Sequence, residues 1–372
     1  MRCLFAILCF GCAPSAPIQA CADSPPDPGG TGAAEATTQG QLDHDDAVKI
    51  DILVNARNPG TSESVQLRVE DGTLTAIGPT VDTTGATPTD AGGRFVSPGL
   101  IDSHVHLAYL PQADELAAGG IVAAVDLAAP LAWLADKPDD LQLLASGPML
   151  TAPGGYPTTS WGRHGYGIEC ATTEAAVAAV DALVDAGAQV VKVPLAGGPE
   201  HSDETLAAIA DRTHHHGLRL AVHALGDEGA ARASAAGADV LVHVPTEPLQ
   251  DSTVAAWSGR AVIPTLAAFG TSAAAVDNLR RLQAAGATVL YGTDFGNARV
   301  AGISQPELDA MADAGMSAEA VWASATRIPA DFWGWPELGR LEVGAQGSLW
   351  LTERDPTLEI STLAEGERWP SH

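Results

Sequence analysis

The sequence predicts an α/β fold, in which a (β/α)8 TIM-like barrel carries a small β-sandwich domain formed by both flanks of the chain. Within residues 98–335, eight short apolar runs alternate with Ala-rich stretches of helical period. Near-continuous apolar strands that alternate with helices indicate parallel strands buried on both faces. Short β-like runs with turn signals fill residues 48–97 and return in 336–360, so both flanks are expected to pair into one domain.

The apolar runs match the strand number of a barrel. They are LIDSHVHL (100–107), GIVAAVDLA (120–128), LQLLASGPML (141–150), QVVKVPLA (189–196), LRLAVHAL (218–225), DVLVHVP (239–245), AVIPTLAA (261–268) and TVLYGTD (288–294). An open doubly wound sheet would show a similar alternation. The count of eight, in a region close to the roughly 250 residues of a typical barrel, favours the barrel.

Helices are predicted between the strands, where apolar residues recur at i, i+3, i+4 and i+7 and a Gly ends each run. Four such segments lie at 175–188, 204–217, 228–238 and 273–287. SAEAVWASATRIPADFWGW predicts one terminal helix after the barrel, and LGRLEVGAQGSLWLTERDP then returns to turn-separated strands.

The first 22 residues have the pattern of a signal peptide. One positive charge precedes an apolar run over 3–12, and Ala20-Cys21-Ala22 supplies small residues for cleavage. The run is too short to cross a bilayer as a helix, which needs about 20 apolar residues. A misassigned start codon ahead of a cytoplasmic enzyme is the alternative.

Residues 23–47 predict a flexible tether, because they are rich in Pro, Gly, Ser, Thr and Asp and lack apolar periodicity. A signal followed by a tether favours an exported protein, either periplasmic or held at the membrane as a lipoprotein. A lipid anchor would use Cys12 or Cys21. Four of the five cysteines lie within the first 21 residues, so no scattered disulfide framework is expected.

The charge balance excludes a nucleic-acid binder. The chain has 46 acidic and 19 basic residues, for a formal net charge of −27. Such a chain is repelled by phosphate backbones and by anionic membrane surfaces. The expected partner is a small-molecule substrate, and assembly into a homo-oligomer stays open.

Candidate functional residues stand at the C-terminal ends of the predicted strands, where barrel active sites lie. These positions hold His104, His106, Lys192, His223, His243 and Asp294. His104 and His106 are two residues apart on one strand, so both imidazoles point to the same face. Neutral imidazoles on one face are good ligands for Zn²⁺ or a similar divalent ion. The sequence therefore predicts a metal site at the barrel mouth.

Lys192 is unusual because its neighbours in QVVKVPL are all apolar. A buried ammonium is costly unless it is neutralised or paired. One resolution is a carbamate, formed when the neutral amine takes up CO₂, which would bridge two metal ions. The other is a buried ion pair between Lys192 and Asp294 beside a single metal.

The loop APGGYPTTSWGRHGYGIEC, at 152–170, lies on the catalytic side of the predicted barrel. Tyr156, Arg163 and His164 in this loop are candidates for binding the substrate. Packing within the loop is the competing explanation for Tyr156 and His164.

PGLIDSHVHL, at 98–107, resembles the signature of the amidohydrolase superfamily of metal-dependent hydrolases. VVKV, AVHA, LVHVP and GTD follow in the family's order, and the tail resembles imidazolonepropionase-like members. The resemblance covers Val48 to Pro356. Three departures stand out: Ala123-Ala124 replace an expected Thr pair, Gly347-Ser348 replace Ala-Asp, and only 13 residues separate His106 from the next strand run.

The resemblance implies a binuclear centre holding two divalent ions, with Zn expected and Mn or Fe as alternatives. His104, His106 and Asp294 would hold the first ion, His223 and His243 the second, and carboxylated Lys192 would bridge both. This match favours the carbamate over the ion pair.

The resemblance also implies a mechanism. A metal-activated bridging hydroxide would attack a carbonyl, Asp294 would pass the proton to the leaving nitrogen, and His243 would help to stabilise the oxyanion. The expected function is hydrolysis of a non-peptide C–N bond in a cyclic amide or related small amide. An exported Xaa-Pro-type dipeptidase and a lactone or ester hydrolase are the alternatives. A metal-free binding protein is disfavoured, since all six ligand positions are filled.

Overall fold

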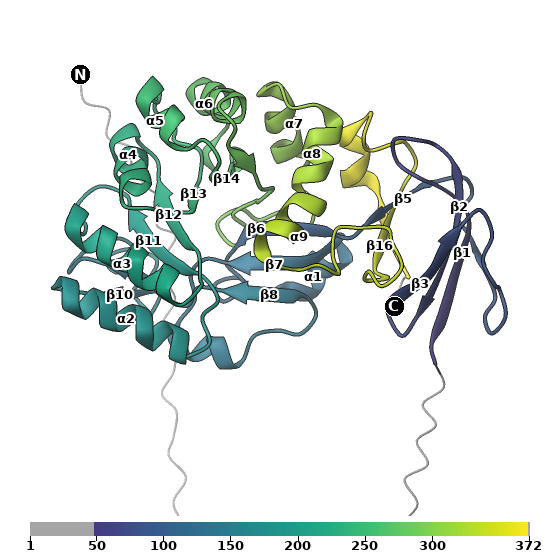
Figure 1. Ribbon diagram of the computed structural model, residues 1–372, viewed down its shortest axis with the longest axis horizontal. Helices are drawn as coiled ribbons and strands as arrows, with labels where there is room; N and C mark the ends of the chain where they lie inside the picture. The colour runs from purple at the N-terminus through teal and green to yellow at the C-terminus, as the bar shows by residue number, and fades with distance from the viewer. Residues whose placement is uncertain (1–47, 371–372) are drawn as a thin grey trace, which may run out of the picture. The chain divides into compact units, whose positions relative to one another are not determined.

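The structure is a computed structural model that describes residues 48–370. The predicted signal peptide and tether lie outside the described residues. Residues from Val48 onward form one compact unit (Figure 1). Among the helices described for this unit, none combines the length and apolar character needed to span a bilayer.

The barrel strands follow the predicted order, and every pairing among them is parallel. They are β6 (Leu100–Val105), β7 (Ile121–Asp126), β8 (Gln142–Ala145), β9 (Met149–Thr151), β11 (Val191–Leu195), β12 (Leu220–Ala224), β13 (Val240–Val242), β14 (Ala261–Ile263) and β15 (Thr288–Val289). The third predicted strand is divided into β8 and β9. Short β10 (Gly167–Glu169) pairs with β9 from the loop that follows it.

Hydrogen bonds between segments close these strands into the predicted barrel. Gln189 N donates to Ala145 O at 2.9 Å, which joins β8 to the start of the β11 run. At the other seam, the segment after β15 lies beside β6, and His106 N donates to Phe295 O at 2.7 Å. First and last strands are therefore neighbours, and the (β/α)8 barrel predicted from the sequence is confirmed.

The helices that surround the barrel include all four predicted ones. They are α1 (Ala113–Ala118), α2 (Thr173–Asp185), α3 (Asp203–His215), α4 (Asp227–Ala235), α5 (Asp251–Ala256), α6 (Ala273–Ala284), α7 (Gln305–Asp313), α8 (Ala318–Ser324) and α9 (Arg327–Trp333). The side chains of Thr172, Ser202 and Ser272 accept a backbone N–H at the starts of α2, α3 and α6. The six residues of α1 match the short first connection noted in the sequence.

The prediction of one terminal helix is wrong, because α8 and α9 are separate. Pro329 has no N–H, and its ring would clash with the carbonyl of Ala325 in a continuous helix. The backbone leaves helical geometry at Thr326, with φ −129° and ψ −100°, and Pro329 falls in the first turn of α9. Between β7 and β8 there is only a 3₁₀ turn, Leu131–Ala135, since Pro130 and Pro138 leave no room for a longer helix.

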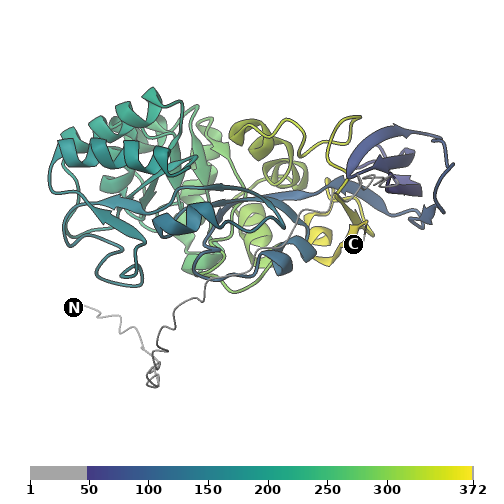
Figure 2. The same ribbon diagram turned by 90° about the horizontal axis from the view of Figure 1, so that it is seen from below.

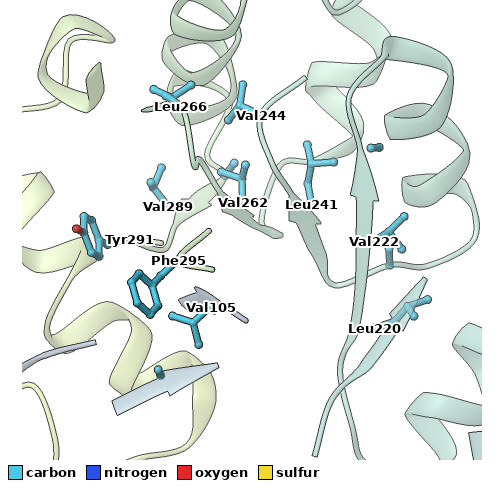
Figure 3. Close-up of a cluster of buried hydrophobic side chains, with 14 of the residues drawn as sticks. Val105, Leu220, Val222, Leu241, Val244, Val262, Leu266, Val289, Tyr291 and Phe295 are labelled. Carbon is cyan, nitrogen blue, oxygen red and sulfur yellow. The ribbon is translucent and has the colours of Figure 1, made fainter. Parts of the chain in front are cut away.

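Alternating strand residues build two apolar layers. Val222, Leu241 and Val262 belong to the outer layer between strands and helices, part of which Figure 3 shows. Their neighbours Ala221 and Val240 belong to the inner layer. Because side chains alternate along a strand, His223 and Lys192 share the inner face with Ala221 and Val190 respectively. The inner layer thus forms the floor beneath the candidate site.

Strands from both ends of the chain share one seven-stranded sheet, in the order β17-β16-β5-β1-β2-β3 with β4 beside β1. Its members are β1 (Ile50–Arg57), β2 (Ser64–Glu70), β3 (Thr73–Gly78), β4 (Thr89–Asp90), β5 (Phe95–Pro98), β16 (Leu349–Thr352) and β17 (Glu367–Trp369). β16 pairs antiparallel with β5, and both views show the yellow C-terminal segment beside the purple N-terminal strands (Figures 1 and 2). This flanking sheet includes β17, which lies beyond the expected range of 336–360. The division between sheet and barrel stays a prediction.

Replacing Gly292 by Ala should destabilise the barrel, because the new Cβ would lie 2.4 Å from Ile263 Cγ2 and 3.2 Å from His104 Cβ. Overpacking of this kind costs about 1–3 kcal/mol, and urea unfolding measures it. Gly78→Ala is the control, since its Cβ would meet nothing closer than Thr80 O at 3.6 Å. Equal losses in the two variants would contradict the proposed close approach.

Candidate metal centre

All six predicted ligand residues line one cavity of about 360 Å³ at the C-terminal ends of the barrel strands. The remaining lining residues are Met149, Tyr156, Trp161, Ala196, Leu225, Ala268, Phe269 and Asn297. His104, Lys192 and His223 lie on β6, β11 and β12, and His243 and Asp294 follow β13 and the last barrel strand. Strand ends far apart in sequence therefore meet at one place.

The tightest group is formed by His104, His106 and Asp294. The two Nε2 atoms lie 3.2 Å apart, and Asp294 Oδ1 is 3.0 Å from His106 Nε2 and 3.5 Å from His104 Nε2. All three side chains are buried, and their ligand atoms lie close enough together to hold one metal ion. Two imidazole nitrogens and a carboxylate oxygen are ligands that Zn²⁺ accepts.

His223 and His243 complete the ring of imidazoles. Their ring centroids are 4.6 Å apart, and His243 lies 4.9 Å from His104. His243 Nδ1 is 2.6 Å from Thr265 Oγ1. We assign the proton to Nδ1, which donates to the hydroxyl, because this leaves the Nε2 lone pair for the cavity.

The backbone is strained at three positions of the site. His243, Thr265 and Asp294 have φ angles of 69°, 47° and 58°, in a region that residues other than Gly rarely adopt. Val240 and Val242 belong to the inner layer, so continued strand geometry would direct His243 outward. The left-handed turn brings its ring into the cavity. Such strain persists where the surrounding fold imposes it, and it is typical of functional sites.

Burial keeps the imidazoles of His104, His223 and His243 neutral. It lowers the pKa of His223 to about 3, and it lowers the pKa of His104 and His243 well below the usual value, with Lys192 and the neighbouring histidines as further causes. A neutral imidazole is the form that binds metal.

Lys192 is fully buried, and its Nζ has no hydrogen-bond partner among the described residues. Burial lowers the pKa of Lys192 to about 7, although Asp294 and Asp126 act in the opposite direction. The ion pair with Asp294 considered from the sequence is absent from the described part of the chain, since no contact between the two charged groups is present there. The site therefore contains an unpaired amine that loses its proton easily.

Two buried carboxylates hold the β6 end in place. Asp102 accepts from His104 N at 3.0 Å and from Thr293 N and Oγ1 at 3.1 and 2.5 Å. Asp126 accepts three backbone N–H groups, those of Leu107, Ala108 and Ala128. Burial raises the pKa of Asp102 to about 7 and that of Asp126 to about 6. Neither carboxylate was predicted from the sequence, although each is a lone acid in a largely apolar strand, the same signal that singled out Lys192.

Of the three residues expected to bind substrate, the structure brings only Tyr156 to the cavity. Its ring stacks on His223 at 5.3 Å, and its hydroxyl accepts from Trp161 Nε1 at 2.7 Å. Burial raises the pKa of Tyr156 to about 12. Arg163 and His164 are exposed and outside the cavity lining, and Arg163 donates to Thr159 O at 3.0 Å.

Several wall residues were also missed. Asn297 Nδ2 donates to both carboxylate oxygens of Asp294, at 3.1 and 3.3 Å, and so fixes the orientation of this group. Trp161 lies 5.4 Å from the His106 ring, and Phe269 lies 4.7 Å from the His243 ring. A large aromatic residue in the Gly- and Pro-rich loop was the available signal for Trp161.

Replacing Thr265 by Val should weaken binding of Zn²⁺ by about 10- to 100-fold, because His243 would lose the partner that orients its ring. Competition with a chromophoric chelator measures the affinity. Thr213→Val is a matched control, since Thr213 is buried and bonded to Ile209 O in α3, on the outside of the barrel. A similar loss of affinity in both variants would show that general destabilisation, and not the contact with His243, causes the effect.

The chain is similar to several known proteins. The chain is 29% identical over 367 residues to an imidazolonepropionase from Mycolicibacterium smegmatis. The aligned region covers 84% of this chain and 90% of that protein. A solved Xaa-Pro dipeptidase with bound methionine superposes with a TM-score of 0.73 at 20% identity, over 85% of this chain and 97% of that one. A putative prolidase from Bifidobacterium longum gives a TM-score of 0.73 at 24% identity, over 85% and 92%.

The two structural matches show the fold. The family itself rests on the model of the amidohydrolase family, which matches residues 95–368, well over half of the chain. The motifs that first suggested the family lie inside this range, from the HVH run to the GTD run. The chain belongs to the amidohydrolase family.

Proposed function

We propose that this chain is a metal-dependent hydrolase that cleaves a non-peptide C–N bond in a cyclic amide or a related small amide. Family membership supports a hydrolase acting on a small molecule. The observation that carries the proposal is the convergence of His104 Nε2, His106 Nε2 and Asp294 Oδ1 in a buried cavity large enough for a small substrate.

The donor set fits divalent ions. His104, His106 and Asp294 would hold one ion, and His223 and His243 would hold a second, with Zn²⁺ expected and Mn²⁺ or Fe²⁺ as alternatives. Metal bound there would lower the pKa of a coordinated water and polarise the substrate carbonyl.

Asp294 is the proposed acid and base. Its carboxylate faces the same point as the two Nε2 atoms, so it is placed to accept a proton from the attacking water. The same group then delivers this proton to the leaving nitrogen as the C–N bond breaks, which yields an acid and an amine. Asn297 holds the carboxylate in one orientation during both transfers. His243 and the Tyr156 hydroxyl are candidates for stabilising negative charge on the carbonyl oxygen.

Lys192 is proposed to carry a carbamate. Its amine would add CO₂ and lose one proton, which replaces an unpaired buried amine with an anion between the two groups of ligands. The complete burial of Nζ, its lack of a partner and its lowered pKa support this modification. The carbamate would supply the bridging ligand that the described side chains do not otherwise provide.

A dipeptidase of the Xaa-Pro type is the second candidate. The structural similarity to a Xaa-Pro dipeptidase and to a putative prolidase favours it, although it extends only to the fold. The same acid–base apparatus would also serve a lactone or ester hydrolase, because the attacked group is again a carbonyl.

Removing metal with a chelator should abolish hydrolysis, and Zn²⁺ or Mn²⁺ should restore it, because neither Asp294 nor the imidazoles activate water sufficiently alone. The assay is a panel of cyclic amides, N-acyl amino acids, dipeptides and lactones. His104→Ala should stay inactive after metal is restored while keeping its circular dichroism spectrum. Full turnover by chelator-treated protein would contradict the metal mechanism.

Lys192→Ala should lose metal and activity together, and formate or acetate should restore part of both by supplying a carboxylate. Lys192→Arg should not recover, since a guanidinium stays charged and forms no carbamate. Metal content by mass spectrometry is read beside turnover. A crystal structure with an unmodified Lys192 amine and one bound metal would replace the binuclear proposal with a mononuclear one.

A further inference from the structure

We infer that the cavity selects a neutral amide with an apolar or aromatic acyl group and disfavours substrates with a free carboxylate. This inference rests on the proposed hydrolase function and narrows its substrate class. It also separates the two candidates above, since a dipeptide always carries a carboxylate.

The walls that enclose the imidazoles are aromatic and aliphatic. Trp161, Tyr156 and Phe269 each place a ring against one histidine, at centroid distances of 5.4, 5.3 and 4.7 Å. Met149 and Leu225 complete the wall. A planar or apolar group bound beside the reacting carbonyl would therefore contact rings and methyl groups, which favours aromatic and aliphatic substituents.

Apart from the proposed metal ions, the wall of the cavity offers no cationic side chain to a substrate carboxylate. Among its described lining residues the only basic side chain besides histidine is Lys192, which is buried at the floor and assigned to the carbamate. Neither Arg163 nor Arg299, the arginines of the two loops beside the mouth, lines the cavity. Arg163 is exposed and bonds to Thr159 O, and Arg299 is exposed and lies over the Tyr109 ring at 5.9 Å. A carboxylate held against the wall, away from the metal ions and the reacting carbonyl, would lose its hydration without gaining a partner.

The neighbouring surface adds repulsion. A groove that shares Ala196 and Leu225 with the cavity is lined by Glu200, Glu228 and Glu247. The one arginine that lines it, Arg232, is already bonded to Glu200 and Asp203, at 2.6 and 2.7 Å. An anionic substituent that extends from the cavity into this groove would meet carboxylates.

One polar group suits an uncharged carbonyl. The Tyr156 hydroxyl accepts from Trp161 Nε1, and no described residue accepts its own proton. That proton is available to a carbonyl oxygen of the substrate. Recognition thus combines one neutral hydrogen-bond donor with apolar walls.

The test compares N-(phenylacetyl)pyrrolidine with N-(phenylacetyl)proline, which differ by one carboxylate. Calorimetry on metal-free protein, at alkaline pH where the Lys192 amine is neutral, should show the pyrrolidine amide binding about 10- to 100-fold more tightly, the range expected for burying an unpaired charged group. The metal-loaded enzyme should show the same order in kcat/KM. Equal or tighter binding of the proline compound, or binding of neither, would overturn the inference.

Two variants test whether the preference depends on charge in the cavity wall or on the charge of the whole chain. Leu225→Arg adds a cation to the wall and should reduce the preference at least about tenfold. Leu358→Arg adds the same charge between β16 and β17, outside the cavity lining, where Leu358 is 79% exposed. This variant should leave the preference unchanged. Equal shifts in the two variants would overturn the inference. Trp161→Ala gives an independent check, because loss of the stacking ring should weaken the neutral compound about tenfold or more without favouring the anion.

Two experimental outcomes distinguish a wrong substrate preference from a wrong reaction. Selective binding of the neutral compound without any metal-dependent turnover would contradict the hydrolase and leave the selectivity standing. Metal-dependent turnover that prefers the proline compound would support the hydrolase and overturn the selectivity.

Discussion

The seam between the first and last barrel strands is the constraint on which the site depends. Asp102 bonds to both the backbone and the hydroxyl of Thr293, and Asp294 N donates to His104 O at 2.9 Å. Gly292 makes this approach possible, because any Cβ there would collide with Ile263. The seam brings the carboxylate of Asp294 against the two imidazoles of β6. Without it, the ligand atoms would belong to opposite edges of an open sheet.

Buried polar groups of two kinds surround this seam. Asp102, Asp126 and Glu307 are buried carboxylates, and each accepts backbone N–H groups, so their role is to hold chain segments together. Lys192 is different, because its Nζ lacks a partner among the described residues. An unpaired buried amine is costly, so its presence beside the Nε2 atoms of His104 and His106 is better explained by a ligand or a modification than by a structural role.

Much of this architecture was predictable, for reasons that differ between fold and site. Apolar runs of strand length revealed the barrel, and residues at strand ends, such as His223 and Lys192, revealed the candidate ligands, because parallel strands end on one rim. Arg163 shows the limit of this reasoning. The order of strands and loops in the sequence indicates on which side of the barrel a loop residue lies. The direction of its side chain depends on backbone dihedral angles that the sequence pattern does not give. Thr265 and Asn297 could not be identified from the sequence, because their importance depends on contacts with His243 and Asp294 that no local pattern encodes.

The seam also has a consequence for how the chain assembles. Asp102 and Thr293 are 191 residues apart, so their contact closes a loop that contains all the intervening strands of the barrel. Contacts of such long range are slow to form, because the chain between them must first be ordered. A ligand that binds across the seam would stabilise the finished barrel over any partly assembled form. Metal uptake would then mark completion of folding, and a nascent chain that has not yet delivered its last strand would have no site to fill.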